Sequence, residues 1–164
     1  MLRKVTLLAA ALVLVAGPAF AAGKAKEPAD IAFSYEGPFG TYDQAQLQRG
    51  YKVYREVCAA CHSMDLLAFR NLGDRGGPFY VPKYPNANDN PYVKAIAAEA
   101  QISDLDSETG DAIKRPGTPA DRFPAPFANV IAAKASNGGI APPDLSLMAK
   151  AREGGPEYIA ALLQ

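Results

Sequence analysis

Six consecutive residues, Val57–His62, read V-C-A-A-C-H and contain both cysteines and the only histidine of the 164-residue chain. At this spacing two thiols lie on one face of a helix end, where they reach two vinyl groups of one haem. Each thiol adds across a vinyl group to form a thioether, and the following residue is then held beneath the ring. We therefore predict one covalent haem c, bound through Cys58, Cys61 and His62, with His62 as an axial iron ligand.

Other uses of a C-x-x-C pair fit this chain less well. A structural zinc site needs four ligands, usually supplied as two Cys/His pairs, and the chain has no second pair. A thioredoxin-like dithiol follows a strand in a βαβ unit, whereas this motif ends an amphipathic helical pattern. A disulfide across two intervening residues would be strained and would leave His62 without a role.

The imidazole of His62 needs a hydrogen-bond acceptor for its second nitrogen, because that bond fixes the ring. Pro142 and Pro143 form a rigid segment without amide hydrogens, and their backbone carbonyls are candidates for this role. The same two prolines are also typical of a loop end that precedes a helix capped by Asp144. Both interpretations stay open at this point.

A sixth iron ligand is not evident in the sequence. Methionine suits electron transfer, and after residue 21 the chain has only Met64 and Met148. Met64 is tied to the His62 side of the ring. Met148 follows a helical apolar pattern that is more typical of core packing. We expect the sixth ligand to lie beyond Gln164.

Residues 1–21 have the features of a secretory signal peptide. Two basic residues precede the apolar run Val5–Ala16, and small residues lead up to Ala21. We predict cleavage after Ala21, export, and a cytochrome c domain over residues 22–164. Without the two basic residues of the leader, 15 basic residues stand against 17 acidic ones. This balance excludes the basic footprint of a nucleic-acid-binding protein.

Hydrophobic periodicity and turn residues predict an all-α chain with long loops. Gly50 lies inside the first predicted helix, where glycine costs about 1 kcal/mol relative to alanine. We interpret it as a site of close approach by another helix rather than as a tolerated defect. Thr41 or Asp43 would cap that helix, and Asn90 would cap the second. The predicted helices cover residues 41–61, 91–100, 127–136, 145–152 and 157–163, with residues 102–126 as loop.

Three blocks of sequence extend beyond the haem motif itself. They are Arg49–Met64 (RGYKVYREVCAACHSM), Asn137–Ser146 (NGGIAPPDLS) and Lys150–Tyr158 (KAREGGPEY). Together they resemble the cytochrome c1 family, the haem subunit of the ubiquinol–cytochrome c oxidoreductase (cytochrome bc1) complex, over most of residues 22–164. The first block contains a motif shared by all c-type cytochromes. The other two are far more specific to this family.

The resemblance implies a class I cytochrome c-like fold with long loops and insertions. It implies an electron-transfer subunit, not an enzyme by itself, that takes electrons from the Rieske iron–sulfur protein and passes them to a cytochrome c. Cytochrome b and the Rieske protein would be its partners in a membrane complex, on the periplasmic side of the bacterial inner membrane. It also implies haem-propionate contacts for Arg152 and Tyr158, and an axial methionine and a transmembrane anchor after Gln164.

Two other functions remain compatible with the residues. A freestanding periplasmic electron carrier would need the same covalent haem but no anchor. A haem-based ligand-binding or sensor module would exploit an iron without a sixth protein ligand. For Arg152, a solvated cation near a helix C-terminus is as good an interpretation as a propionate partner.

Overall fold

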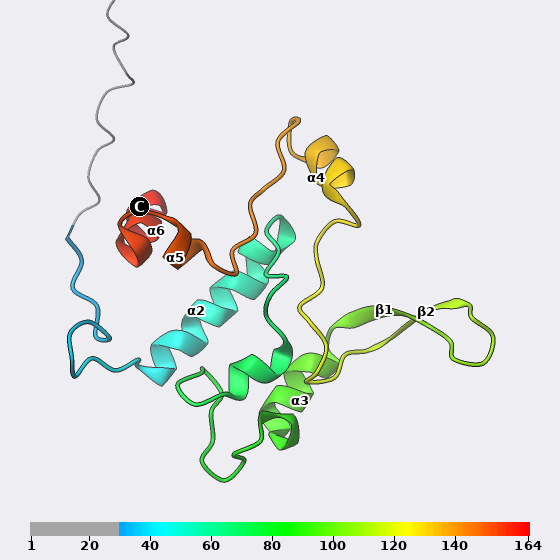
Figure 1. Ribbon diagram of the computed structural model, residues 1–164, viewed down its shortest axis with the longest axis horizontal. Coiled ribbons are helices and arrows are strands. Elements are labelled where there is room, and N and C mark those ends of the chain that lie inside the picture. Colours follow the sequence, from blue (N-terminus) through cyan, green and yellow to red (C-terminus); the bar gives the residue numbers. More distant parts are fainter. Residues whose placement is uncertain (1–29) are drawn as a thin grey trace, which may run out of the picture.

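The computed structural model describes residues 30–164. The predicted signal peptide, residues 1–21, therefore lies outside the described residues. Short helices surround α2, and one antiparallel hairpin projects away from them (Figure 1). In chain order the elements are α2 (Gln44–Glu56), η1 (Cys58–Ala60), η2 (Phe69–Gly73), η3 (Ala87–Asp89), α3 (Pro91–Ala98), β1 (Gln101–Leu105), β2 (Ala112–Pro116), α4 (Val130–Ser136), α5 (Met148–Ala151) and α6 (Gly155–Leu162).

Helix α2 leads directly into the cysteine motif. The side chain of Asp43 caps its start by accepting the backbone N–H of Gln46 at 2.6 Å. The helix ends at Glu56, because the φ of −121° at its C-cap Val57 leaves the helical region, and the 3-10 turn η1 follows. The prediction of one helix over residues 41–61 is therefore too long at both ends. A tighter turn, rather than a continued α-helix, carries the cysteines.

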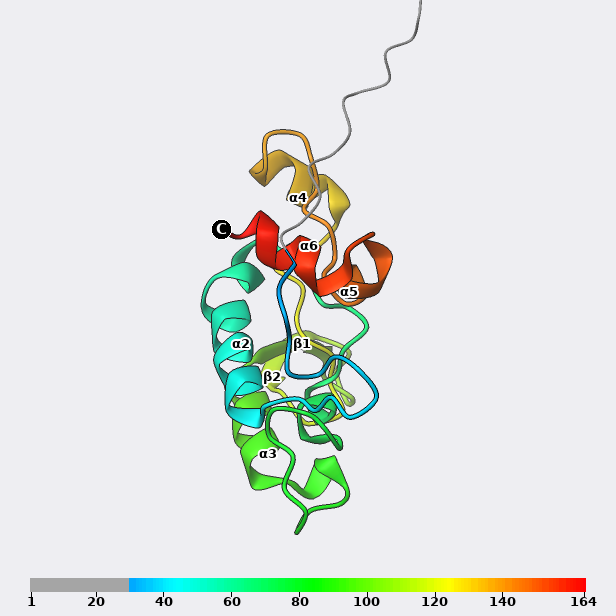
Figure 2. The same ribbon diagram turned by 90° about the vertical axis from the view of Figure 1, so that its left-hand side faces the viewer.

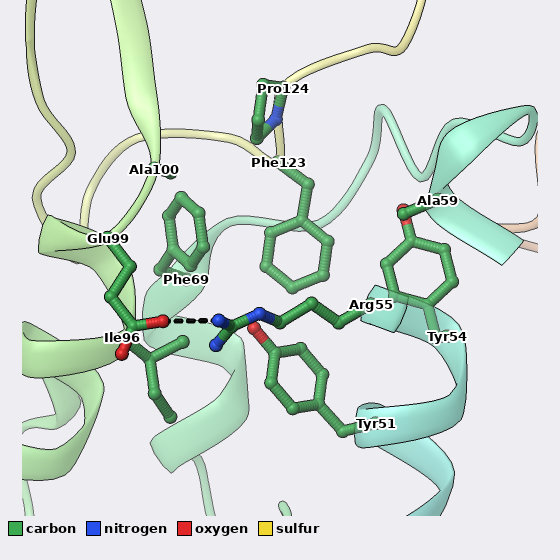
Figure 3. Close-up of a pocket in the computed structure, with 10 residues that line it drawn as sticks. All are labelled: Tyr51, Tyr54, Arg55, Ala59, Phe69, Ile96, Glu99, Ala100, Phe123 and Pro124. Atoms are coloured by element: carbon green, nitrogen blue, oxygen red, sulfur yellow. Dashed lines mark ion pairs between the residues drawn. The ribbon is translucent and has the colours of Figure 1, made fainter. Parts of the chain in front are cut away.

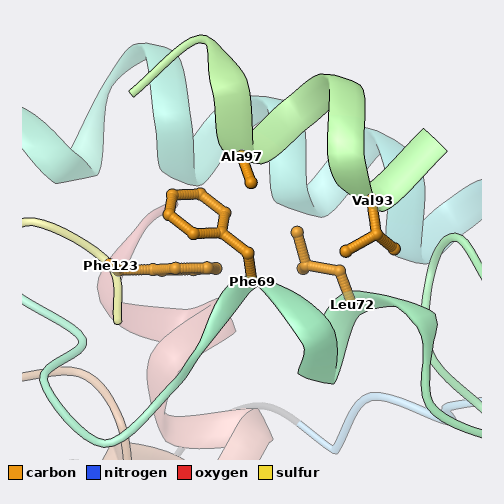
Figure 4. Close-up of a cluster of buried hydrophobic side chains, with 5 residues drawn as sticks. All are labelled: Phe69, Leu72, Val93, Ala97 and Phe123. Atoms are coloured by element: carbon orange, nitrogen blue, oxygen red, sulfur yellow. The ribbon is translucent and has the colours of Figure 1, made fainter. Parts of the chain in front are cut away.

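The largest buried cluster of the described residues lies between η2 and α3. Figure 4 shows that η2 and α3 each contribute two side chains, while a loop closes the cluster with an aromatic ring. Tyr51 and Tyr54 of α2 pack against the same cluster, so the core also positions the helix that leads to the motif. The cluster members are Phe69, Leu72, Val93, Ala97 and Phe123.

Asn90 confirms the predicted cap of α3 and does more than cap it. Its Oδ1 accepts the backbone N–H of Tyr92 at 3.0 Å, and Pro91 occupies the first turn. Its Nδ2 donates to the backbone carbonyl of Phe79 at 2.7 Å. The side chain is completely buried, with 0% of its surface exposed. Asn90 therefore joins the start of α3 to the loop after η2.

Gly50 does not mark a close helix contact within the described residues. A Cβ placed on Gly50 would meet no atom within 4 Å. The interpretation as a site of close approach is wrong for this part of the chain. Glycine here is a tolerated defect in an exposed helix interior.

A hairpin replaces part of the predicted loop over residues 102–126. Strands β1 and β2 pair antiparallel, and the carboxylate of Asp106 organises the turn by accepting the N–H groups of Glu108 and Thr109. At the base, Arg115 donates to Asp121 at 2.7 and 2.9 Å. Most hairpin side chains are exposed, so no alternation of apolar and polar residues marks the strands. The all-α prediction holds for the helices but overlooks this sheet.

The C-terminal helices lie at the opposite end of the molecule from α3 in both views (Figure 1, Figure 2). Helix α4 begins at Val130, after its cap Asn129 and three residues later than predicted, and ends at Ser136, just before Gly138 and Gly139, which adopt φ of 63° and 91°. Helix α5 is shorter than predicted, and α6 is close to the predicted range. No helix in residues 30–164 has the length and apolar character needed to span a bilayer.

Candidate haem site

The 3-10 turn η1 begins at Cys58, and Cys61 directly follows it, so both cysteines lie at the end of α2. Cys58 is half-buried, Cys61 is exposed, and both are free thiols. The carbonyl of Cys58 accepts the backbone N–H of Cys61 at 3.1 Å and that of His62 at 2.8 Å. These two bonds hold the motif in a compact turn. The structure thus brings the predicted ligands together at a helix end that stays accessible to a large planar group.

The ring of His62 is held by a residue far away in sequence. Nδ1 of His62 lies 2.8 Å from the backbone carbonyl oxygen of Pro143, 81 residues downstream. Because a carbonyl can only accept, Nδ1 must carry the hydrogen, and Nε2 keeps its lone pair for a metal. The structure confirms the predicted acceptor role for this proline pair and assigns it to Pro143 rather than Pro142.

The segment after His62 is tied to the segment after Pro143 by several hydrogen bonds. Asp144 Oδ2 accepts the Ser63 hydroxyl and the Asp65 backbone N–H, both at 2.8 Å. The backbone N–H of Leu145 donates to the Ser63 carbonyl at 2.8 Å. Asp144 was predicted to cap a helix starting at Leu145, and this is wrong, because α5 begins only at Met148. Its carboxylate instead connects two loops.

The pKa of Asp144 reflects these bonds. Burial raises the pKa, but hydrogen bonds from Ser146, Asp65 and Ser63 outweigh the burial and lower it to about 2. The carboxylate is therefore charged at any physiological pH. A charged acceptor also makes each of its hydrogen bonds stronger than a neutral one would be.

Apolar side chains are left exposed on the chain that follows the core. Val130 and Ile131 of α4 are 62% and 81% exposed, and Ile140 in the next loop is 76% exposed. A hollow of about 240 Å³ lies beside Cys61 and is bordered by Val130 and by the segment Ala141-Pro142. Exposed apolar side chains beside a hollow are typical of a surface that an apolar ligand or a partner covers.

A second pocket, of about 150 Å³, lies behind the motif and is shown in Figure 3. Aromatic side chains line it, and Arg55 reaches across to Glu99 with an N···O distance of 2.5 Å. The hydroxyl of Tyr54 lies 3.5 Å from the carbonyl oxygen of His62. Burial, followed by the charge of Asp144, raises the pKa of Tyr54 to about 12. Tyr54 is therefore a neutral phenol that supports the motif from the core side.

The remaining candidate residues take other positions. Met64 is half-buried and packs against the core cluster. The sulfur of Met148 accepts a hydrogen bond from Arg152 Nε at 3.3 Å, so these two side chains contact each other one helical turn apart. Tyr158 of α6 is about one-third exposed, at 36%.

Comparison with known proteins now identifies the family. The model of the Cytochrome C1 family matches residues 33–164. The chain belongs to the cytochrome c1 family. Cytochrome c1 of Rhodospirillum rubrum is 48% identical over 164 residues, which cover 98% of this chain and 56% of that relative.

Two further relatives have related names. The cytochrome b/c1 protein of Bradyrhizobium diazoefficiens is 45% identical over 84% of this chain and 22% of that relative. The mitochondrial cytochrome c1 heme protein of Saccharomyces cerevisiae is 46% identical over 80% of this chain and 39% of that relative. The chain thus spans about half, or less, of the length of these relatives. The family predicted from the three sequence blocks is confirmed.

Sequence reasoning missed the residues that link the two halves of this candidate site. Ser63 and Ser146 both take part, the latter by accepting the Leu66 N–H on its hydroxyl at 3.1 Å. No local spacing marks these partners, because they lie about 80 residues apart along the chain. The only available signal was that Ser63 adjoins the motif and Ser146 ends the second family block.

Proposed function

We propose that this chain transfers electrons through one covalently bound haem c. Cys58 and Cys61 would hold the haem by thioethers, and His62 would bind the iron through Nε2. When bound, the haem iron supplies one-electron redox chemistry. The observation that carries the proposal is the bond from Nδ1 of His62 to the Pro143 carbonyl, which leaves Nε2 available.

Three properties of the described residues fit such a group. The cysteines are free thiols at a helix end, as thioether formation requires. The ring of His62 already has the tautomer that a ligand to iron needs. The exposed side chain of Val130, beside the hollow at Cys61, supplies apolar surface that a porphyrin would cover. The fold, in which the C-x-x-C-H motif lies at the end of a helix, also fits a class I cytochrome c-like arrangement.

We further infer a place in a membrane-bound electron-transfer complex. The Candida albicans relative is named a cytochrome b-c1 complex catalytic subunit, and the Bradyrhizobium relative is named cytochrome b/c1. By family membership, electrons would arrive from the Rieske iron–sulfur protein and leave to a cytochrome c, with cytochrome b as a neighbour. The chain would perform no bond chemistry itself.

Export and domain organisation belong to the same proposal. A signal peptide over residues 1–21 would place the domain of residues 22–164 on the periplasmic side of a bacterial inner membrane. Covalent attachment suits that compartment, because it prevents loss of the haem. Arg152 and Tyr158 remain candidates for contacts to haem propionates, because an Arg fork matches a carboxylate.

The test is expression of the chain together with a functional haem-ligation system. We expect Soret absorbance, and haem that stays on the protein after acid–acetone extraction. Replacing Cys58 and Cys61 together by Ala should make the haem extractable, and His62→Ala should shift the Soret band, because it removes an axial ligand of the iron. The exposed Ser107→Ala variant, in the distant hairpin turn, is the control and should keep both properties. Material without any Soret absorbance would refute the proposal.

The place in a complex needs a separate measurement. Purification from its native membrane should recover the chain together with cytochrome b and the Rieske protein. Recovery of the haem-loaded chain alone from the soluble periplasm would favour a freestanding carrier instead. An iron that binds external ligands readily, in material purified from that membrane, would favour a sensor module.

A further inference from the structure

Asp144 is the centre of a hydrogen-bonded junction beside the motif. Its Oδ2 accepts from the Ser63 hydroxyl and the Asp65 N–H, and its Oδ1 accepts the N–H of Ser146, each at 2.8 Å. Two of the three donors lie directly after His62, and the third lies in the same loop as Asp144. One carboxylate therefore joins the segment that follows the predicted iron ligand to the segment that follows its acceptor.

The junction determines where the Pro143 carbonyl lies. Pro143 directly precedes Asp144, and the backbone N–H of Leu145 donates to the Ser63 carbonyl at 2.8 Å. Proline lacks an N–H, so Pro142 and Pro143 make no backbone donation of their own that would hold the segment in place. The position of the acceptor carbonyl thus depends on the contacts of the residues that follow it.

We propose that Asp144 is a positioning residue for His62. By anchoring the loop to Ser63 and to the Asp65 backbone, it holds the Pro143 carbonyl against the Nδ1–H of the imidazole. That bond orients the ring and makes Nε2 a stronger electron donor, which favours ferric over ferrous iron. The inference rests on the proposed function, because it concerns how strongly His62 donates to a haem iron.

A simpler account is that the carboxylate acts only through its charge. Asp65 separates the two accounts, because it carries the same charge next to the same junction. Only its backbone joins the junction: the N–H donates to Asp144, and the carbonyl accepts from Arg122. Asp65→Asn therefore removes a nearby charge and leaves the junction intact. Ser63→Ala does the reverse, since it removes one hydrogen bond to Asp144 and no charge.

The experiment compares four haem-loaded proteins: wild type, Asp144→Asn, Ser63→Ala and Asp65→Asn. An amide cannot accept at both of its ends, so Asp144→Asn loses at least one of the three bonds. Covalent haem is measured first, as the pyridine haemochrome, followed by a redox titration. By two-dimensional NMR of the reduced protein, the exchange of the Nδ1–H of His62 with solvent is also followed.

Asp144→Asn should favour reduction by about tenfold, at the lower end of effects known for residues that support metal ligands, which equals about 59 mV for one electron. Ser63→Ala should shift in the same direction by a smaller factor. Both should exchange the Nδ1–H faster than wild type, while Asp65→Asn stays within about twofold in both measurements.

Two outcomes would overturn the inference while leaving haem binding in place. One is full haem content with unchanged potential and unchanged exchange in both junction variants. The other is an Asp65→Asn shift as large as that of Asp144→Asn, which would assign the effect to charge. Should Asp144→Asn fail to fold, Ser63→Ala decides by the same criteria. A wild-type chain without covalent haem would instead refute the proposed function.

Discussion

Asn90 tests how the start of α3 is joined to the loop after η2. The two ends of its side-chain amide have opposite hydrogen-bonding roles. Oδ1 accepts from Tyr92 N, and Nδ2, in a fully buried side chain, donates to the carbonyl of Phe79. Asn90→Ala removes the cap, at about 1 kcal/mol, and leaves the carbonyl unpaired, at about 1–3 kcal/mol. We expect a total loss of about 2–4 kcal/mol in the free energy of unfolding.

Asn90→Asp is the more informative change. Aspartate is as good an N-cap as asparagine on an isolated helix, and its charge suits a helix N-terminus. At this position, however, its second oxygen would face the Phe79 carbonyl oxygen without water. We therefore expect a loss of about 3 kcal/mol at neutral pH. The introduced carboxyl group should have a raised pKa in the folded state, so stability falls as pH rises above its unfolded value of about 3.9 and recovers in acid.

Asn129 is the matched control, because it caps α4 through Oδ1 but is exposed and donates no bond to a buried carbonyl. Asn129→Ala should cost about 1 kcal/mol, and Asn129→Asp should change stability by less than about 0.5 kcal/mol. Urea denaturation followed by circular dichroism, at constant m-value, measures all four variants. Equal stability of Asn90→Asp and wild type at neutral pH would refute the reasoning.

Two further predictions concern α2 and the junction. Gly50→Ala should raise the free energy of unfolding by about 0.5–1 kcal/mol in urea denaturation, because the added methyl group meets open space; a loss of stability would reveal a contact outside the described residues. The lowered pKa of Asp144, about 2 against an ordinary 3.8, contributes stability that is present above pH 4 and is lost as the pH falls towards 2. We expect about 1–2 kcal/mol, allowing for its partial exposure to water. The stability difference between wild type and Asp144→Asn, measured from pH 6 to pH 2, should shrink over that window, and a constant difference would contradict it.

Much of the fold was predictable where the signals are local. The structure confirms the predicted Asn90 cap at the start of α3, where Pro91 occupies the first turn. The glycines after Asn137 mark the end of α4 in the same way. Each signal acts on backbone groups only a few residues away. Contacts with distant parts of the chain therefore had little effect on these helix ends.

Other elements escaped prediction because their stability comes from elsewhere. The hairpin at residues 101–116 is mostly exposed, and Arg115 ties it to Asp121 beyond the strand itself. The interpretation of Gly50 was wrong because the sequence does not distinguish a helix glycine that faces open space from one that contacts another helix. Asp144 was misread because its spacing to Leu145 fits a cap, while its actual partners follow His62.

The predicted attachment chemistry rests on the sequence alone, since C-x-x-C-H places two thiols and an imidazole within five residues of the chain. Family membership was likewise readable from residue order. Only the tertiary structure decided which carbonyl meets Nδ1 of His62, and which carboxylate anchors that carbonyl. The physical reason is distance along the chain: the partners are 81 residues apart, so their meeting depends on how the intervening core and loops pack.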